Sequence, residues 1–164
     1  MKEQTILSQQ LTVTFIHCDD RSCHNCQKKQ KTFHWLEQIL NSGKWEEVPP
    51  VIIVKDAESE QLLVYDGNVR TNFATLKKLN LRAVIITDQN ELNDYFKDHS
   101  VLWFGIKDFR ELLEYMRIYA NYPRDDRFKE MPAELIKKIK EKSWQYEEEC
   151  RKERNRFFGW YNDD

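Results

Sequence analysis

The stretch PVIIVKDAESEQLLVYDGNVRTNFATLKKLNLRAVIIT, residues 50–87, decides the fold of this chain. It begins with VIIV at 51–54, a continuous apolar run directly after two prolines, which is typical of a buried strand. Residues 62–65 (LLVY) form a second apolar run. The polar residues between the two runs predict a turn, so we expect a hairpin or two neighbouring strands.

The rest of the stretch predicts a helix and a further strand. Asp-Gly-Asn at 66–68 is a strong turn signal, and residues 83–87 (AVIIT) are typical of a strand. Between them, apolar residues recur at helical spacing at Phe73, Ala74, Leu76 and Leu79. Strand, turn, helix and strand in this order indicate a βαβ-like unit.

The flanking segments complete the expected organisation. Residues 11–16 alternate apolar and polar side chains as a strand does, and apolar spacing predicts a helix over about 32–41 that ends near Gly43. Beyond residue 90 the pattern is mostly helical, and the last charged helix is expected from about Pro132 through at least Arg156. We therefore expect an α/β (α+β) chain: an α/β body over residues 1–100 and a helical region over 101–164.

Composition limits the classes of function. The 164 residues suffice for one compact domain with an appendage, and 26 basic against 28 acidic residues give a net charge of −2, so no global basic field attracts nucleic acid. No window approaches the ~20 consecutive apolar residues of a membrane span, and the N-terminus lacks the features of a signal peptide. A cytoplasmic protein without membrane contact is the expectation.

The turn at 66–71 has the chemistry of an anion pocket. A strand delivers it to the start of a helix, where unpaired backbone N–H groups and the helix dipole attract negative charge. Gly67 permits close approach of a phosphate, Asn68 and Thr71 can cap or donate, and Arg70 offers a planar set of donors. The same residues also fit a plain capped turn with a surface arginine.

The order of these elements resembles the ParB/sulfiredoxin superfamily over about residues 32–90. The matching pieces are Trp35–Gly43, Pro50–Val54, Leu62–Tyr65, Asp66–Arg70 and Ala83–Thr87. The resemblance implies a small mixed sheet and a loop that binds nucleotide phosphates through Gly67, Asn68 and Arg70, with Asp66 and Thr71 beside them. ATP, ADP and CTP are the candidate nucleotides.

The loop also departs from the family. Asn68 and Val69 stand where sulfiredoxins place a catalytic cysteine, so sulfinic-acid repair is not expected. The Glu-Arg-Arg core that binds CTP in chromosome-partition ParB proteins is missing as well. If the chain transfers phosphoryl groups or hydrolyses a nucleotide, an acceptor-orienting base is required, and Asp66 and Glu47 are the candidates.

A cysteine–histidine cluster precedes the first expected helix. Its C-x4-C-x2-C spacing suits a structural zinc site formed by Cys18, Cys23, Cys26 and His34, with His17 as the alternative fourth ligand. Three other interpretations stay open: an iron–sulfur site that includes Cys150, a Cys23–Cys26 redox pair, and free thiols.

The C-terminal segment combines basic and aromatic residues. Arg151, Lys152, Arg154 and Arg156, followed by Phe157, Phe158, Trp160 and Tyr161, could contact nucleic acid. Two simpler interpretations of these residues are a solvent-exposed helical face and aromatic side chains that pack the tail against the body of the protein. Two candidate functions follow. The first is a nucleotide-binding protein, either an enzyme that hydrolyses the nucleotide or transfers its phosphoryl group, or a DNA-associated module controlled by the nucleotide. The second is a non-catalytic, zinc-stabilised protein whose helical tail binds a protein partner.

Overall fold

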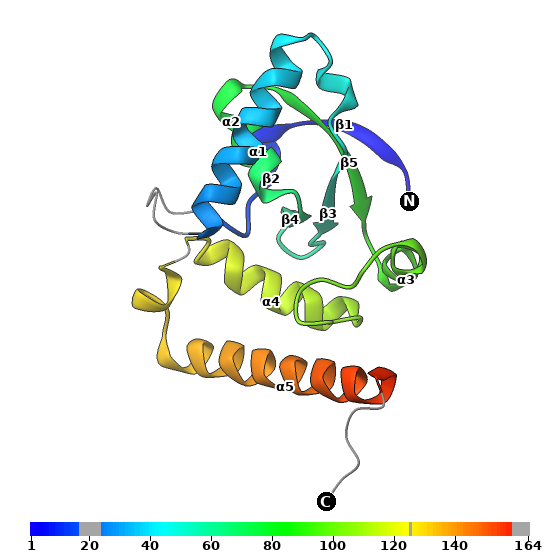
Figure 1. Cartoon of the computed structure of the whole chain (residues 1–164), viewed down its shortest axis with the longest axis vertical. Helices are drawn as coiled ribbons and strands as arrows, with labels where there is room; N and C mark the ends of the chain where they lie inside the picture. Colours follow the sequence, from blue (N-terminus) through cyan, green and yellow to red (C-terminus); the bar gives the residue numbers. More distant parts are fainter. Residues whose placement is uncertain (17–23, 125, 159–164) are drawn as a thin grey trace, which may run out of the picture.

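The computed structural model describes residues 1–16, 24–124 and 126–158, and the chain folds into a five-stranded sheet with helices on both faces (Figure 1). Short 3-10 segments at Ser8–Gln10, Trp45–Glu47 and Arg127–Lys129 complete the described elements. The strands are β1 (Glu3–Leu7), β2 (Leu11–Thr12), β3 (Val51–Lys55), β4 (Leu62–Asp66) and β5 (Asn80–Ile86). The helices are α1 (His24–Asn41), α2 (Asn68–Lys77), α3 (Gln89–Asp98), α4 (Phe109–Asn121) and α5 (Ala133–Phe158).

The sheet is mixed, in the order β1-β5-β3-β4-β2. Strand β3 pairs parallel with β5 and antiparallel with β4, while β1 joins β5 antiparallel and β2 joins β4 parallel. The apolar run at 51–54 is buried throughout, because this central strand is covered on both faces. The expected α/β class with a small mixed sheet is confirmed.

The expected βαβ-like unit is wrong in its pairing. β4 and β5 are not neighbours, since β3 lies between them, and they run antiparallel to each other. The chain reverses after β3 in a turn where the Asp56 N–H donates to the Gln61 carbonyl (2.9 Å). This reversal makes β4 a hairpin partner of β3, so α2 must carry the chain past β3 to its far side.

The N-terminal segment also differs from expectation. β1, at residues 3–7, was not predicted, because Ile6 is its single buried residue and its pattern carries almost no periodic signal. The strand expected over 11–16 pairs as a strand only at Leu11–Thr12, and Ile16 instead forms an isolated bridge with Arg124. Helix α1 begins at His24, well before the apolar spacing predicts.

Successive side chains along the strands point to opposite faces of the sheet, and each face packs into its own apolar layer. Val51 and Ile53 of β3 pack with Ala74 of α2 on one face, and α1 closes this side through a cluster of Leu36, Val48 and Phe73. On the opposite face, residues of β3 and β4 pack with α3, α4 and the start of α5. Ile52, Val54, Leu63, Tyr65, Leu92, Leu112, Met116 and Ile139 belong to this second layer.

The helical region therefore shares its core with the sheet, and the apolar packing continues across the expected boundary near residue 100. Helix α5 lies along α4 (Figure 1), to which ion pairs Lys138–Glu114 and Lys142–Glu111 also join it. Among the helices of the described ranges, none has the length and apolarity needed to cross a bilayer.

A buried carboxylate ties the β3–β4 turn to α4. Asp56 is fully buried, and the Arg117 guanidinium donates to both of its oxygens, from Nε to Oδ2 (2.7 Å) and from Nη2 to Oδ1 (2.8 Å). The Ser59 hydroxyl and the Glu58 N–H donate to the same carboxylate. These hydrogen bonds hold the pKa of Asp56 well below its ordinary value, against the opposing effect of burial.

This lowered pKa predicts an acid-sensitive contribution to stability. Asp56→Asn should lower the free energy of unfolding at pH 7 by about 2–4 kcal/mol, because it removes the charge from a buried, hydrogen-bonded acceptor. The contribution is complete above the unfolded pKa of about 4 and is lost as the pH falls toward the folded value, so wild type and variant should converge in acid. Urea denaturation between pH 7 and pH 2 measures this.

Glu58→Gln is the matched control. Its carboxylate also meets Arg117 (3.1 Å), but the side chain is 83% exposed, so the variant should change stability by less than about 0.5 kcal/mol. A gap between wild type and Asp56→Asn that stays constant from pH 7 to pH 2 would contradict the assignment.

Candidate functional site

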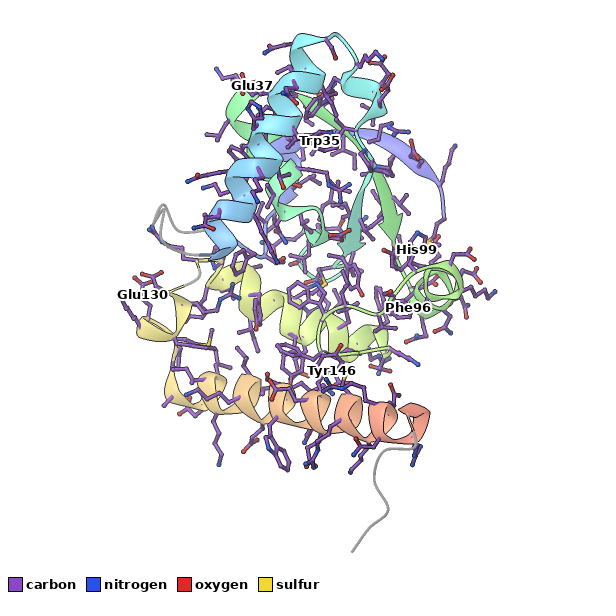
Figure 2. All side chains as sticks on the ribbon, in the orientation of Figure 1. Trp35, Glu37, Phe96, His99, Glu130 and Tyr146 are labelled. Carbon is purple, nitrogen blue, oxygen red and sulfur yellow. The ribbon has the colours of Figure 1, made fainter. Side chains whose placement is uncertain are left out.

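A cavity of about 730 Å³ opens where β4 ends and α2 begins. Trp35 of α1 and His99, which follows α3, belong to its wall, and Figure 2 labels both side chains. Pro49 and Pro50, just before β3, line another part of the cavity, and so do the first residues of α2. The cavity thus lies at the turn that the sequence singles out.

Gly67 makes this turn sterically possible. Its φ of +103° lies in the left-handed region, which residues that carry a Cβ rarely adopt. A Cβ here would sit 2.6 Å from Val51 Cγ1, so the backbone passes directly over the central strand. Glycine is therefore required by the packing of the protein itself, a role different from the phosphate approach expected from the sequence.

Three backbone N–H groups at the start of α2 have no acceptor in the part of the chain that the structure describes. The first helical hydrogen bond runs from the Thr71 N–H to the Gly67 carbonyl (2.9 Å), which leaves the N–H groups of Asn68, Val69 and Arg70. All three residues line the cavity. The helix dipole places its positive end at this point, so the arrangement favours a bound anion.

The Asn68 side chain anchors the N-terminal segment. Its Oδ1 accepts from the N–H groups of Thr14 (2.9 Å) and Phe15 (3.1 Å), and its Nδ2 donates to Thr14 Oγ1 (3.1 Å). The buried Thr14 hydroxyl in turn donates to the Val64 carbonyl of β4 (2.7 Å). The amide group expected to face a ligand therefore holds residues 14 and 15 against the turn and places Phe15 on the cavity wall.

The Arg70 guanidinium is engaged with the protein. Nη1 donates to the carbonyls of Pro49 (2.8 Å) and Pro50 (2.9 Å), and Nη2 lies 3.3 Å from Asp66 Oδ2. Its side chain is 16% exposed, although the residue lines the cavity. Arg70 thus holds the two prolines that precede β3 against the start of α2, and the Asp66 carboxylate partly offsets its positive charge.

The remaining loop and catalytic candidates divide into two groups. Asp66 lies at the end of β4 and lines the cavity with Gly67, Asn68 and Arg70. Thr71 is fully buried and is not part of the cavity wall. Glu47 is also away from it, exposed in the short helix before β3 and paired with Lys44 (3.6 Å).

His99 was not identified from the sequence. Its Nδ1 lies 3.0 Å from the Tyr95 carbonyl, and its ring stacks on the Tyr95 ring with centroids 4.2 Å apart. A carbonyl can only accept, so Nδ1 carries a hydrogen and donates it to this carbonyl. No local sequence pattern marks His99 as a site residue, because only the packing of α3 on the sheet brings it close to the β4–α2 turn.

The expected metal site falls mostly outside the described residues. Cys18, Cys23 and His17 lie there, as does the side chain of Cys26. His34 is exposed on α1, with Nε2 3.1 Å from Gln38 Nε2. The zinc site therefore stays a prediction, as do its iron–sulfur, redox and free-thiol alternatives.

The expected nucleic-acid contacts are partly described. Arg151, Lys152, Arg154 and Arg156 are exposed on the last turns of α5, whereas Trp160 and Tyr161 lie outside the described residues, with the side chains of Phe157 and Phe158. Cys150, on the same helix, is a free thiol.

Comparison with protein-family models, with curated proteins and with solved structures found no match for this chain. The resemblance to the ParB/sulfiredoxin superfamily therefore stays a prediction from the motifs and their order.

The steric role of Gly67 predicts a large loss on substitution. Gly67→Ala should cost about 3 kcal/mol in the free energy of unfolding, because it combines left-handed strain with overlap on Val51. Gly43→Ala is the matched control: φ there is +71° but no atom lies within 4 Å, so only the conformational cost of about 1 kcal/mol is expected. Equal losses in chemical denaturation would contradict the steric account.

Proposed function

We propose that this protein binds a nucleotide whose phosphates lie at the start of α2. The observation that carries the proposal is the set of N–H groups of Asn68, Val69 and Arg70, which lack acceptors among the described residues and belong to residues that line the cavity. Phosphate oxygens accept hydrogen bonds from such groups, and the helix dipole adds attraction. The cavity volume, about 730 Å³, lies within the usual range of about 300–1,000 Å³ for ligand pockets.

Arg70 acts in this proposal through its charge and its position. The Pro49 and Pro50 carbonyls hold the guanidinium beside the turn, so little conformational entropy is lost when a ligand arrives. The likeness of the Asp66–Arg70 loop to the ParB/sulfiredoxin superfamily points to the same class of ligand. ATP, ADP and CTP are the nucleotides to be compared.

Turnover of the nucleotide, by hydrolysis or phosphoryl transfer, is the enzymatic form of the proposal. It requires a group that orients the acceptor oxygen near the phosphates. Asp66 is suited to this role, because the residue lines the cavity and its Oδ2 lies 3.3 Å from Arg70 Nη2. Glu47 does not line the cavity and drops out of this form of the proposal.

The exposed part of α5 supports a second candidate function, a protein whose tail binds a partner. Trp144 is 62% exposed, and the last turns of the helix carry exposed arginines. In this candidate function a protein or nucleic-acid partner binds this surface, and a zinc ion held by the cysteine cluster stabilises the fold. Indifference of the protein to every nucleotide would favour this candidate over the first.

Val69→Glu tests the phosphate site directly. The new carboxylate would stand in the first turn of α2, where the dipole favours it, so the fold should keep its stability. The same charge would repel phosphate oxygens, so the affinity for ATP, ADP or CTP should fall at least tenfold in isothermal titration calorimetry.

Val69→Gln is the matched control, with the same length and no charge, and should bind within about threefold of wild type. Binding by Val69→Glu that equals wild type would contradict the proposed phosphate site. Absence of binding by wild type to all of the nucleotides would contradict nucleotide binding altogether.

A further inference from the structure

A second cavity, of about 310 Å³, adjoins the first and is walled by aromatic rings. Its rings are Phe15, Tyr65, Trp103, Phe104 and Tyr119. They come from the N-terminal segment, β4, the α3–α4 connection and α4, so the wall exists only in the folded chain. Phe15, Tyr65 and Asn68 line both cavities, which places the two side by side.

Contacts with the buried Arg127 hold two of these rings in place. The Arg127 guanidinium lies 3.9 Å from the centroid of the Tyr119 ring and 5.1 Å from that of Phe15. The Ile16 N–H donates to the Pro123 carbonyl (2.6 Å), which fixes the segment that carries Phe15. The cavity is therefore formed before a ligand arrives.

The connection between α3 and α4 is strained where it supplies two more of the rings. Trp103 and Phe104 have φ of +53° and +58°, a conformation that costs bulky residues about 1–3 kcal/mol each. Two hydrogen bonds hold the connection on β4: Trp103 Nε1 donates to the Tyr65 carbonyl (2.9 Å), and the Leu102 N–H donates to Tyr65 Oη (2.8 Å). Burial raises the pKa of Tyr65 to about 12, so this hydroxyl stays neutral at physiological pH.

We propose that the aromatic cavity receives the nucleobase of the nucleotide whose phosphates lie at the start of α2. This inference rests on the proposed function and names the part of the ligand that the second cavity takes. Asn68 joins the two sites, because its backbone N–H belongs to the phosphate site and the residue also lines the aromatic cavity. Aromatic side chains stack on the faces of bases and favour a planar ring over an aliphatic group.

Tryptophan fluorescence distinguishes the two cavities, since Trp103 lines the aromatic one and Trp35 the larger one. ATP should quench the emission of wild type, and Trp103→Phe should lose at least three quarters of that change. Trp35→Phe, the matched control, should keep most of it. Retention of the quenching by Trp103→Phe together with its loss in Trp35→Phe would overturn the inference, because the base would then lie against Trp35.

Leu102→Trp provides a second readout that does not disturb the Trp103 hydrogen bond. Leu102 lines the aromatic cavity and is 41% exposed, so a larger side chain can fill the cavity without replacing core packing. The affinity for ATP should fall at least tenfold, while that for tripolyphosphate, which has no base, should stay within twofold. Leu76→Trp is the matched control: Leu76 is 73% exposed and lines neither cavity, so this variant should bind ATP within about threefold of wild type.

The two proposals fail in different ways. If wild type binds neither ATP nor tripolyphosphate, the phosphate site is wrong and the inference falls with it. If Val69→Glu abolishes ATP binding but Leu102→Trp leaves it unchanged, the phosphate site stands and the aromatic cavity is not the base site.

Discussion

The close approach of the Gly67 backbone to Val51 is the constraint on which the rest of the site depends. A Cβ at this position would lie 2.6 Å from Val51 Cγ1, and φ is +103°. This geometry lets the chain leave the end of β4, pass over the Val51 side chain and begin α2 at Asn68. The first N–H groups of α2 lack an intrahelical acceptor, as at the start of any helix, and the turn places their residues on the cavity wall, where no acceptor of the described chain meets them.

The polar residues of the turn hold its surroundings in place. The Asn68 side chain binds the backbone at Thr14 and Phe15, and Arg70 binds the carbonyls before β3. Side chains that the sequence suggests as ligands thus hold the turn in place, and the backbone N–H groups are the proposed contacts of the anion. The same anchoring of Phe15 forms the aromatic cavity beside it, because Phe15 belongs to both walls.

The sequence predicted those elements whose structure is determined by one short segment of the chain. The strands at 51–55 and 62–66 and the start of α2 follow from local apolar runs and turn residues. The position of β5 did not follow, because β4 pairs with β3 as a hairpin and the pairing of β5 with the far side of β3 is a long-range contact that no local pattern marks. His99 and the aromatic cavity could not be predicted either, since α3 and the α3–α4 connection reach β4 only through long-range packing.

The central claim, that backbone N–H groups at the start of α2 bind phosphate, is tested most directly by NMR. In ¹⁵N-labelled protein titrated with ATP, the account predicts the largest amide shifts at Asn68, Val69 and Arg70, moving downfield as each N–H gains a charged acceptor. Saturation of the protein with ATP while these three resonances stay in place, and shifts appear elsewhere, would contradict it.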